Sequence, residues 1–167
     1  MLKFTTSMVV FSEIPDEITL AINISNCQNN CPGCHSPELR TDIGQELTEN
    51  AVDGLIEKNG GITCFCFMGE GNDKETLKEL ISYVKSKYGL KTALYSGREN
   101  VEEDIIDILD YIKVGPYNAK CGPLNKETTN QRLYKKTEDK NLVLIGYKWY
   151  HGWTDITSKF WKNENLY

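Results

Sequence analysis

The sequence lacks the features that mark a secreted or membrane-bound chain. Residues 1–15, MLKFTTSMVVFSEIP, contain no apolar stretch followed by a small-residue cleavage site, so no signal peptide is expected. No apolar run approaches the roughly 20 residues that a membrane-spanning helix needs. The expected location is therefore the cytoplasm, where cysteines stay reduced. In that setting the six cysteines indicate a metal or redox site rather than a disulfide framework.

An excess of positive charge is also lacking. The chain has 19 Lys and Arg against 24 Asp and Glu, which gives a formal net charge of −5. Because binding to phosphates needs a clustered positive surface, the composition predicts no nucleic-acid partner and no membrane partner. Internal repeats, low-complexity tracts and linkers are absent too. We therefore predict a single domain over residues 1–167.

Segments with the apolar period of a strand alternate with segments that have the period of a helix. Residues 7–25 predict two strands around a Pro-Asp turn, and the second strand leads directly into a cysteine-rich loop. Thr48 and Asp73 are expected to cap helices, and Gly89 is expected to end one. The further expected strands are 62–68, 91–96, 111–114 and 141–149, and the expected helices are 48–61, 73–89 and 100–109.

This alternation predicts an α/β fold whose strands are joined by right-handed crossovers. The strands are too few for a complete eightfold barrel. We expect an open partial (βα) barrel of about five to six mostly parallel strands, and a doubly wound sheet fits the same pattern. In either fold the site lies at the carboxyl ends of the strands. The cysteine loop, "MGEGN", "YSGR" and "VGPYN" all fall at such ends.

Three cysteines, Cys27, Cys31 and Cys34, lie within the sequence CQNNCPGC. A structural zinc site would need a fourth ligand, such as His35 or Cys121, and the chain has no second pair of the CxxC kind. A 4Fe–4S cluster fits the three thiols better. Three thiolates leave one iron open, and an open position separates a catalytic metal site from a structural one. Radical chemistry from S-adenosylmethionine uses such a centre.

The pattern C-x3-C-x2-C resembles the signature of the radical SAM superfamily. Residues 10–135 more narrowly resemble the activating proteins of anaerobic (class III) ribonucleoside-triphosphate reductase. That family has Pro-Gly before its third cysteine, as at 32–33, and a late Ser-Ser-Asn-Gln segment similar to "TTNQRLY". "MGEG" and "YSGR" stand where the family has a Gly-Gly-acid motif and an aromatic-Thr-Gly strand end. The sequence departs from the family at Met68, which replaces a glycine, and at "VGPYN", which lacks an aspartate.

The resemblance implies a fold of the radical SAM type and a role for each matching residue. A 4Fe–4S cluster would be ligated by Cys27, Cys31 and Cys34. The open iron would bind S-adenosylmethionine, which would also contact Gly33, His35, Gly69, Glu70, Ser96 and Gly97. One electron would cleave the cofactor, and the resulting 5′-deoxyadenosyl radical would take a hydrogen atom from a glycine of the reductase large subunit. A low-potential donor such as flavodoxin would supply the electron.

Other functions fit the same residues. The chain could activate another glycyl-radical enzyme, such as pyruvate formate-lyase, or could act on a small molecule. A separate class is a non-catalytic module that binds zinc or an iron–sulfur cluster. Cys64 and Cys66, on one face of a strand, are expected to pack in the core, and Cys121 is expected to be incidental. The aromatic residues near the carboxyl terminus are expected to cap the sheet, with docking of the reductase as the alternative.

Overall fold

In the amino-terminal half, the strands and helices form close to where the apolar pattern predicts them. The computed structural model describes residues 1–161, so the end of the predicted domain, residues 162–167, lies outside it. The helices are α1 (Glu49–Lys58), α2 (Lys74–Tyr88) and α3 (Glu103–Ile106), with 3-10 helices η1 (Pro37–Arg40) and η2 (Thr157–Trp161). The strands are β1 (Lys3–Val10), β2 (Thr19–Ile24), β3 (Gln45–Glu46), β4 (Cys64–Met68), β5 (Lys91–Tyr95), β6 (Tyr111–Val114), β7 (Arg132–Lys136), β8 (Val143–Ile145), β9 (Lys148–Tyr150) and β10 (Trp153–Asp155).

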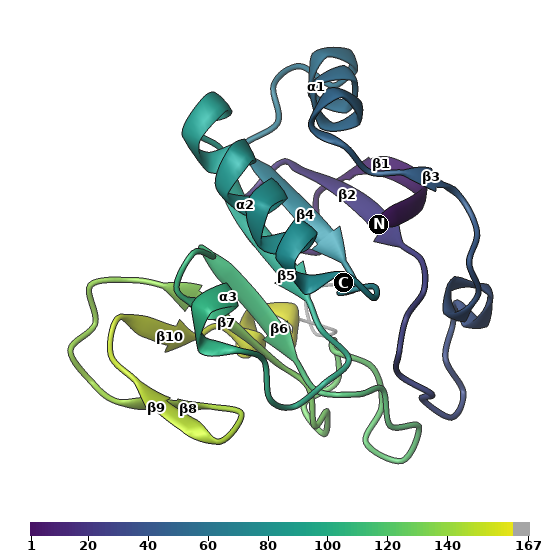
Figure 1. The fold of residues 1–167 in the computed structure, drawn as a ribbon. Coiled ribbons are helices and arrows are strands. Elements are labelled where there is room, and N and C mark those ends of the chain that lie inside the picture. The colour runs from purple at the N-terminus through teal and green to yellow at the C-terminus, as the bar shows by residue number, and fades with distance from the viewer. Residues whose placement is uncertain (162–167) are drawn as a thin grey trace, which may run out of the picture.

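The predicted open partial (βα) barrel is wrong. The structure has a mixed eight-stranded sheet in the order β10-β7-β6-β5-β4-β2-β1-β3, with β8 and β9 in a separate hairpin. Only the central pairings, β2 with β4, β4 with β5 and β5 with β6, are parallel. The outer strands β1, β3, β7 and β10 all pair antiparallel. Strands dominate, and the described residues hold only three α-helices (Figure 1).

The fold prediction fails in the carboxyl-terminal half, where the crossover helices that it requires are missing. After β6 the chain returns through residues 115–131 without an α-helix, so β7 runs antiparallel to β6. A parallel neighbour would have needed a crossover, usually a helix. Helix α3 has one turn instead of the expected residues 100–109, and its N-cap residue, Glu102, makes no side-chain cap. The strand expected at 141–149 is broken by a turn at Gly146, whose φ is +62°, into the β8–β9 hairpin.

The amino-terminal half follows the prediction because its helix signals are local. The Thr48 side chain accepts a hydrogen bond from the Ala51 backbone N–H, and α1 starts at the next residue. Asp73 accepts from the Thr76 N–H in the same way at the start of α2. Gly89 takes the left-handed conformation that ends α2. The predicted turn between β1 and β2 is also present, and the two strands pair antiparallel.

The sheet has two differently covered faces. One face packs Phe65, Phe67 and Leu94 against the buried residues of the helices, among them Val52 and Leu77. The opposite face carries Cys64, Cys66, Ala93 and Tyr111, and is covered by Ile14 and by Ile156 and Phe160 near the carboxyl end. The α-helices therefore lie on one side of the sheet in Figure 1, and irregular segments together with η2 lie on the other.

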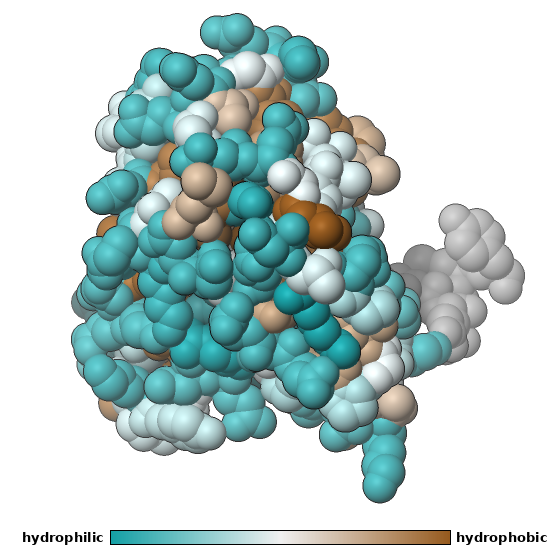
Figure 2. All heavy atoms as spheres, turned by 45° about the vertical axis from the view of Figure 1, so that its right-hand side comes forward, coloured by the Kyte–Doolittle hydropathy of each residue, from teal (hydrophilic) through white to brown (hydrophobic). Residues whose placement is uncertain are grey.

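Hydrophilic residues predominate on the surface shown in Figure 2, with apolar residues scattered between them. This distribution agrees with the mixed charge of the sequence. Within residues 1–161, none of the helices has the length and apolar character needed to cross a membrane.

Candidate functional site

Four loops meet at one edge of the sheet, as the sequence predicts. Strands β2, β4, β5 and β6 are parallel and adjacent, so their carboxyl ends lie together at what we call the carboxyl edge. The residues near these ends stand in one row, with Asn23 opposite Met68, Met68 opposite Tyr95 and Tyr95 opposite Lys113. The loops that follow contain the cysteines, Glu70, Ser96 and Gly115. Sites of parallel sheets usually lie at this edge.

The cysteine loop, residues 25–36, leaves the sheet directly after β2. Its first turn is held by backbone hydrogen bonds from Asn26 to the Thr41 carbonyl and from Cys27 to the Leu39 carbonyl. The Cys34 N–H donates to the Cys31 carbonyl over 3.2 Å and closes a tight turn that contains Gly33, at φ +73°. The Asn26 backbone also has a positive φ, of 58°. The loop therefore has a defined path between β2 and η1.

The three thiols of this loop are free and half-buried. Within residues 1–161, no three His, Cys, Asp or Glu side chains are close enough together to hold a metal ion. The donor chemistry nevertheless suits an iron–sulfur cluster, because three thiols lie in one short loop. An orphaned donor lies beside them. Arg40 gives one guanidinium N–H to the Cys31 carbonyl at 2.7 Å, while its Nε is buried without a partner. The donor types therefore match an iron–sulfur cluster, whereas their described positions do not form a metal site.

Glu70 is the buried centre of a charged network at the carboxyl edge. Its side chain is 7% exposed, and its carboxylate accepts from the Ser96 hydroxyl at 2.6 Å. Arg98 donates to both Glu70 oxygens, from Nε at 2.9 Å and from Nη2 at 2.6 Å. Arg98 also pairs with Glu102, which in turn contacts Lys74. Such bidentate pairs are strong and geometrically specific.

The network shifts the pKa values of its members. Burial alone raises the pKa of Glu102, but hydrogen bonds from Arg98 and Lys74 reverse this and lower it to about 2. The hydrogen bond to Glu70 raises the pKa of the Arg98 guanidinium, so this side chain stays charged. The carboxyl edge thus carries a fixed set of opposite charges next to the cysteine loop.

The loop after β5 is in close contact with the cysteine loop. A Cβ atom added at Gly97 would lie 2.7 Å from the Asn29 Nδ2, so glycine permits this close approach. Cys27, Asn29, Glu70 and Arg98 line one small cavity of about 240 Å³. Cys31 and Gly97 line a more open hollow of about 520 Å³, together with Tyr147 from the β8–β9 hairpin.

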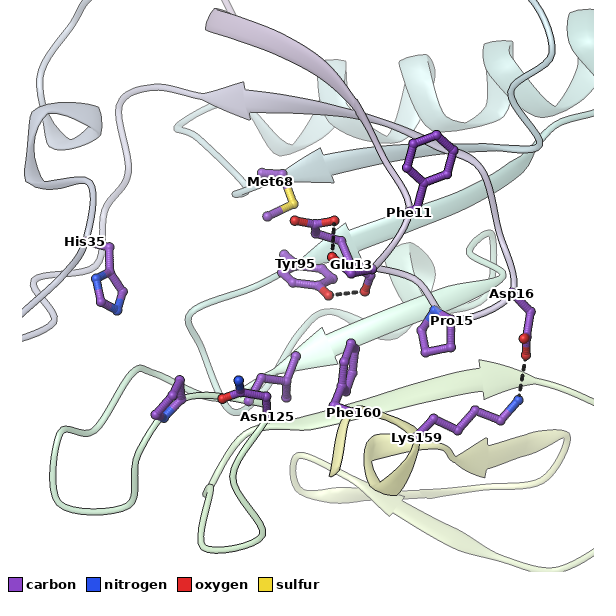
Figure 3. Close-up of a pocket in the computed structure, with 13 residues that line it drawn as sticks. Phe11, Glu13, Pro15, Asp16, His35, Met68, Tyr95, Asn125, Lys159 and Phe160 are labelled. Carbon is purple, nitrogen blue, oxygen red and sulfur yellow. Dashed lines mark hydrogen bonds and ion pairs between the residues drawn. The ribbon is translucent and has the colours of Figure 1, made fainter. Parts of the chain in front are cut away.

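His35 and Gly33 face a different neighbour. The His35 ring lies 5.0 Å from the ring of Tyr117, and an added Cβ at Gly33 would lie 3.5 Å from the same ring. His35 also borders a cavity of about 870 Å³ on the face of the sheet opposite the α-helices. Figure 3 shows Met68 and Tyr95 on the sheet side of this cavity, with Phe160 opposite them.

The predicted site residues therefore fall into two groups. Glu70 and Ser96 are joined by a hydrogen bond, Gly97 follows Ser96, and Gly69 precedes Glu70 with its N–H bonded to the Tyr95 carbonyl at 3.0 Å. Gly33 and His35 lie instead at the Tyr117 side of the cysteine loop. Of the three cysteines, Cys27 lines the cavity that Glu70 also lines, and Cys31 lines the hollow next to Gly97.

The remaining three cysteines, Cys64, Cys66 and Cys121, lie outside the cysteine loop. Cys64 and Cys66 are both fully buried, and burial raises the pKa of each thiol. The Cys66 sulfur contacts the Met68 sulfur at 3.5 Å. These contacts confirm the expected packing role. Cys121 is half-buried in the loop after β6, where its carbonyl accepts from Thr128 at 2.5 Å.

Two charged residues at the carboxyl edge, Arg98 and Lys113, were not predicted from the sequence as site residues. Arg98 ends the "YSGR" motif, and its position two residues after Ser96 was the available signal. Lys113 stands in the otherwise apolar strand YIKV and is 8% exposed. Burial lowers the pKa of Lys113 to about 8, although the charge of Cys31 raises it in part. A lysine at an inward position of a buried strand is a recognisable signal of a charged site.

A scan against protein-family models finds no match for this chain. Searches of curated proteins and of solved structures find none either. The functional assignment therefore rests on the residues of the site.

Proposed function

We propose that this chain is a cytoplasmic radical SAM activase that reductively cleaves S-adenosylmethionine and generates the glycyl radical of an anaerobic ribonucleotide reductase. Cys27, Cys31 and Cys34 would hold a 4Fe–4S cluster. When bound, the cluster would supply the single electron for cleavage of the cofactor. The observation that carries the proposal is the position of the three-thiol loop, which follows β2 at the same sheet edge as the buried Glu70–Ser96 pair.

Glu70 suits the amino group of the cofactor. Its carboxylate is buried, and its orientation is fixed by Ser96 and Arg98. A ligand ammonium would replace part of the Arg98 contact by another charge-assisted hydrogen bond. Arg98 would then retain Glu102 as a partner, at 2.6 Å. The exchange leaves no charge of the network unpaired, which limits its cost.

The cavity between Cys27 and Glu70 supports the same assignment. It encloses about 240 Å³ and is lined by residues of three loops of the carboxyl edge. A ligand held there would be restrained from two sides, by the cysteine loop and by the network. Holding reactants in a fixed geometry is a main contribution of a protein to a reaction whose chemistry belongs to the cofactor.

Metal content distinguishes this proposal from a non-catalytic zinc module. The protein is reconstituted with iron and sulfide without oxygen, and in parallel is offered zinc. We expect about four irons and four sulfides per chain, because one cubane cluster has this composition. Tight binding of zinc, with no uptake of iron and sulfide, would contradict the proposal.

The partner is tested by electron paramagnetic resonance. The reconstituted protein is mixed with S-adenosylmethionine, a reductant and a purified glycyl-radical enzyme. We expect a glycyl radical doublet with an anaerobic ribonucleotide reductase. A doublet with pyruvate formate-lyase alone would move the assignment to that kind of activase. Cleavage of the cofactor with neither partner radicalised would favour a small-molecule substrate.

A further inference from the structure

The cavity of about 870 Å³ on the face of the sheet opposite the α-helices has no role in the proposed function. We call it the Glu13 cavity. Met68 and Tyr95, at the ends of β4 and β5, form its sheet side, and Phe160 of η2 lies opposite them (Figure 3). Its volume falls within the range of about 300–1,000 Å³ that is usual for small-molecule sites. Of the site residues predicted from the sequence, only His35 lines it.

The walls of the Glu13 cavity are mainly apolar and aromatic. Phe11 and Leu124 line it in addition to Met68, Tyr95 and Phe160. Phe11 is 72% exposed, so its ring lies at the opening of the cavity and not in the core. Aromatic ring faces attract cations, and a thioether adapts to irregular apolar shapes. These walls are therefore suited to the apolar body of a ligand.

Glu13 brings a carboxylate into these surroundings. Figure 3 shows this carboxylate between Met68 and the ring of Tyr95. The Tyr95 hydroxyl donates a hydrogen bond to the Glu13 backbone carbonyl, which ties the segment before β2 to the sheet. The carboxylate itself accepts a hydrogen bond from the Ser12 hydroxyl at 3.3 Å, which is long for this type of bond. A carboxylate beside apolar walls is costly unless it is paired.

The other charged groups of the cavity do not neutralise Glu13. The lysine that lines the cavity, Lys159, pairs with Asp16 at 2.8 Å. The His35 ring packs against the ring of Tyr117, with 5.0 Å between their centres. Among residues 1–161, no cation forms an ion pair with Glu13. The cavity therefore has one negative charge without a counter-charge, which favours a cationic ligand.

We propose that the Glu13 cavity binds an organic cation, an ammonium or guanidinium group on an apolar body, with Glu13 as its counter-charge. The cationic group would donate charge-assisted hydrogen bonds to the carboxylate. The apolar body would lie against Met68, Tyr95 and Phe160. Two sources supply this chemistry, a small amine and the basic side chain of a peptide. The inference needs neither the iron–sulfur cluster nor S-adenosylmethionine.

A series of three ligands tests whether the cavity selects a positive charge. Phenylbutylamine, the neutral phenylbutanol and the anionic phenylbutyrate are titrated into isotope-labelled, metal-free protein, and binding is followed by nuclear magnetic resonance. For a ligand of this size we expect the amine to bind with a dissociation constant on the order of 1 mM. The shifted resonances should belong to the residues of the Glu13 cavity. The alcohol should bind about tenfold more weakly and the carboxylate more weakly still.

A pair of variants tests the role of Glu13. Glu13→Gln removes the proposed counter-charge, and Glu46→Gln removes the charge of an exposed residue in β3, at the outer edge of the sheet. We expect E13Q to bind the amine about tenfold more weakly and the alcohol as the wild type does, and E46Q to bind both like the wild type. Unchanged binding of the alcohol also shows that the cavity of E13Q is folded. If E13Q does not fold, the ligand series on the wild type still decides the question.

A short peptide, acetyl-Phe-Arg-amide, distinguishes the two sources of the cation. Tighter binding of the peptide would identify a peptide side chain as the ligand, and tighter binding of the amine would identify a small molecule. Equal affinities for the amine and the alcohol, or an unchanged affinity of E13Q for the amine, would overturn the inference. So would tighter binding of the carboxylate, or the absence of shifts at the cavity with both cations. Since the protein carries no metal in these titrations, either result leaves the proposed function standing, and failure to form a cluster leaves this inference standing.

Discussion

Replacing Glu70 by glutamine tests the charged network at the carboxyl edge. The substitution keeps the size of the side chain but removes the charge that Arg98 binds through two hydrogen bonds. Loss of one partner from a fully buried pair costs about 3–5 kcal/mol. Here Arg98 is 32% exposed and keeps Glu102, so water and a second carboxylate reduce the penalty. We expect E70Q to lower the free energy of unfolding by about 1–3 kcal/mol.

The assay is equilibrium unfolding in urea, followed by circular dichroism, for the wild type, E70Q and a matched control. The control is Glu75→Gln, because Glu75 pairs with Lys78 on the surface of α2 and is 80% exposed. Exposed pairs contribute about 0–1 kcal/mol, so the E75Q midpoint should stay close to that of the wild type. With a urea m-value of about 2 kcal/mol/M, the E70Q midpoint should fall by about 0.5–1.5 M. Equal midpoints for E70Q and E75Q would refute the network.

The other predictions concern pH, backbone strain and the cysteine ligands. The pKa of Glu102 is lowered in the folded protein, so ionised Glu102 stabilises the fold above the ordinary pKa of 4.5, and this stabilisation is lost as the pH falls toward 2. Glu102→Gln should therefore weaken the pH dependence of the urea midpoint in this window. An unchanged dependence would contradict the shift. Gly69 has φ +117°, so Gly69→Ala should destabilise by about 1–3 kcal/mol. Gly54→Ala, in α1 with open space around it, should instead stabilise the protein by about 0.5–1 kcal/mol. If the urea midpoints of the Gly69 and Gly54 variants moved in the same direction, the argument from backbone conformation would be wrong. Cys31→Ala should abolish cleavage of S-adenosylmethionine with the circular dichroism spectrum unchanged, while Cys121→Ala should retain cleavage.

The amino-terminal half of the fold could be predicted because its signals are local. Thr48, Asp73 and Gly89 mark helix ends by hydrogen bonds and backbone conformation within a few residues. The carboxyl-terminal half depends instead on long-range pairing. The segment 132–136 is short and carries three charged residues, so its period does not identify the strand β7 that closes against β6. The barrel prediction failed at this point.

The site was predictable in its location and less so in its contacts. Parallel strands bring their carboxyl ends together whatever follows them, so Glu70 and Ser96 could be placed at one edge from the chain order alone. The contact between Glu70 and Arg98 could not be predicted in this way, because Arg98 reaches Glu70 from the loop that follows the neighbouring strand. The same applies to Lys113, whose hydrogen bonds to Ser96 and Gly115 depend on how two loops fold.

The most direct test of the account is the reductive cleavage of S-adenosylmethionine by the reconstituted protein. The products, methionine and 5′-deoxyadenosine, are measured by chromatography under oxygen-free conditions, with dithionite and without it. The account predicts both products only when the cluster and the reductant are present. A protein that contains the cluster and is reduced by dithionite, yet leaves S-adenosylmethionine intact, would contradict it.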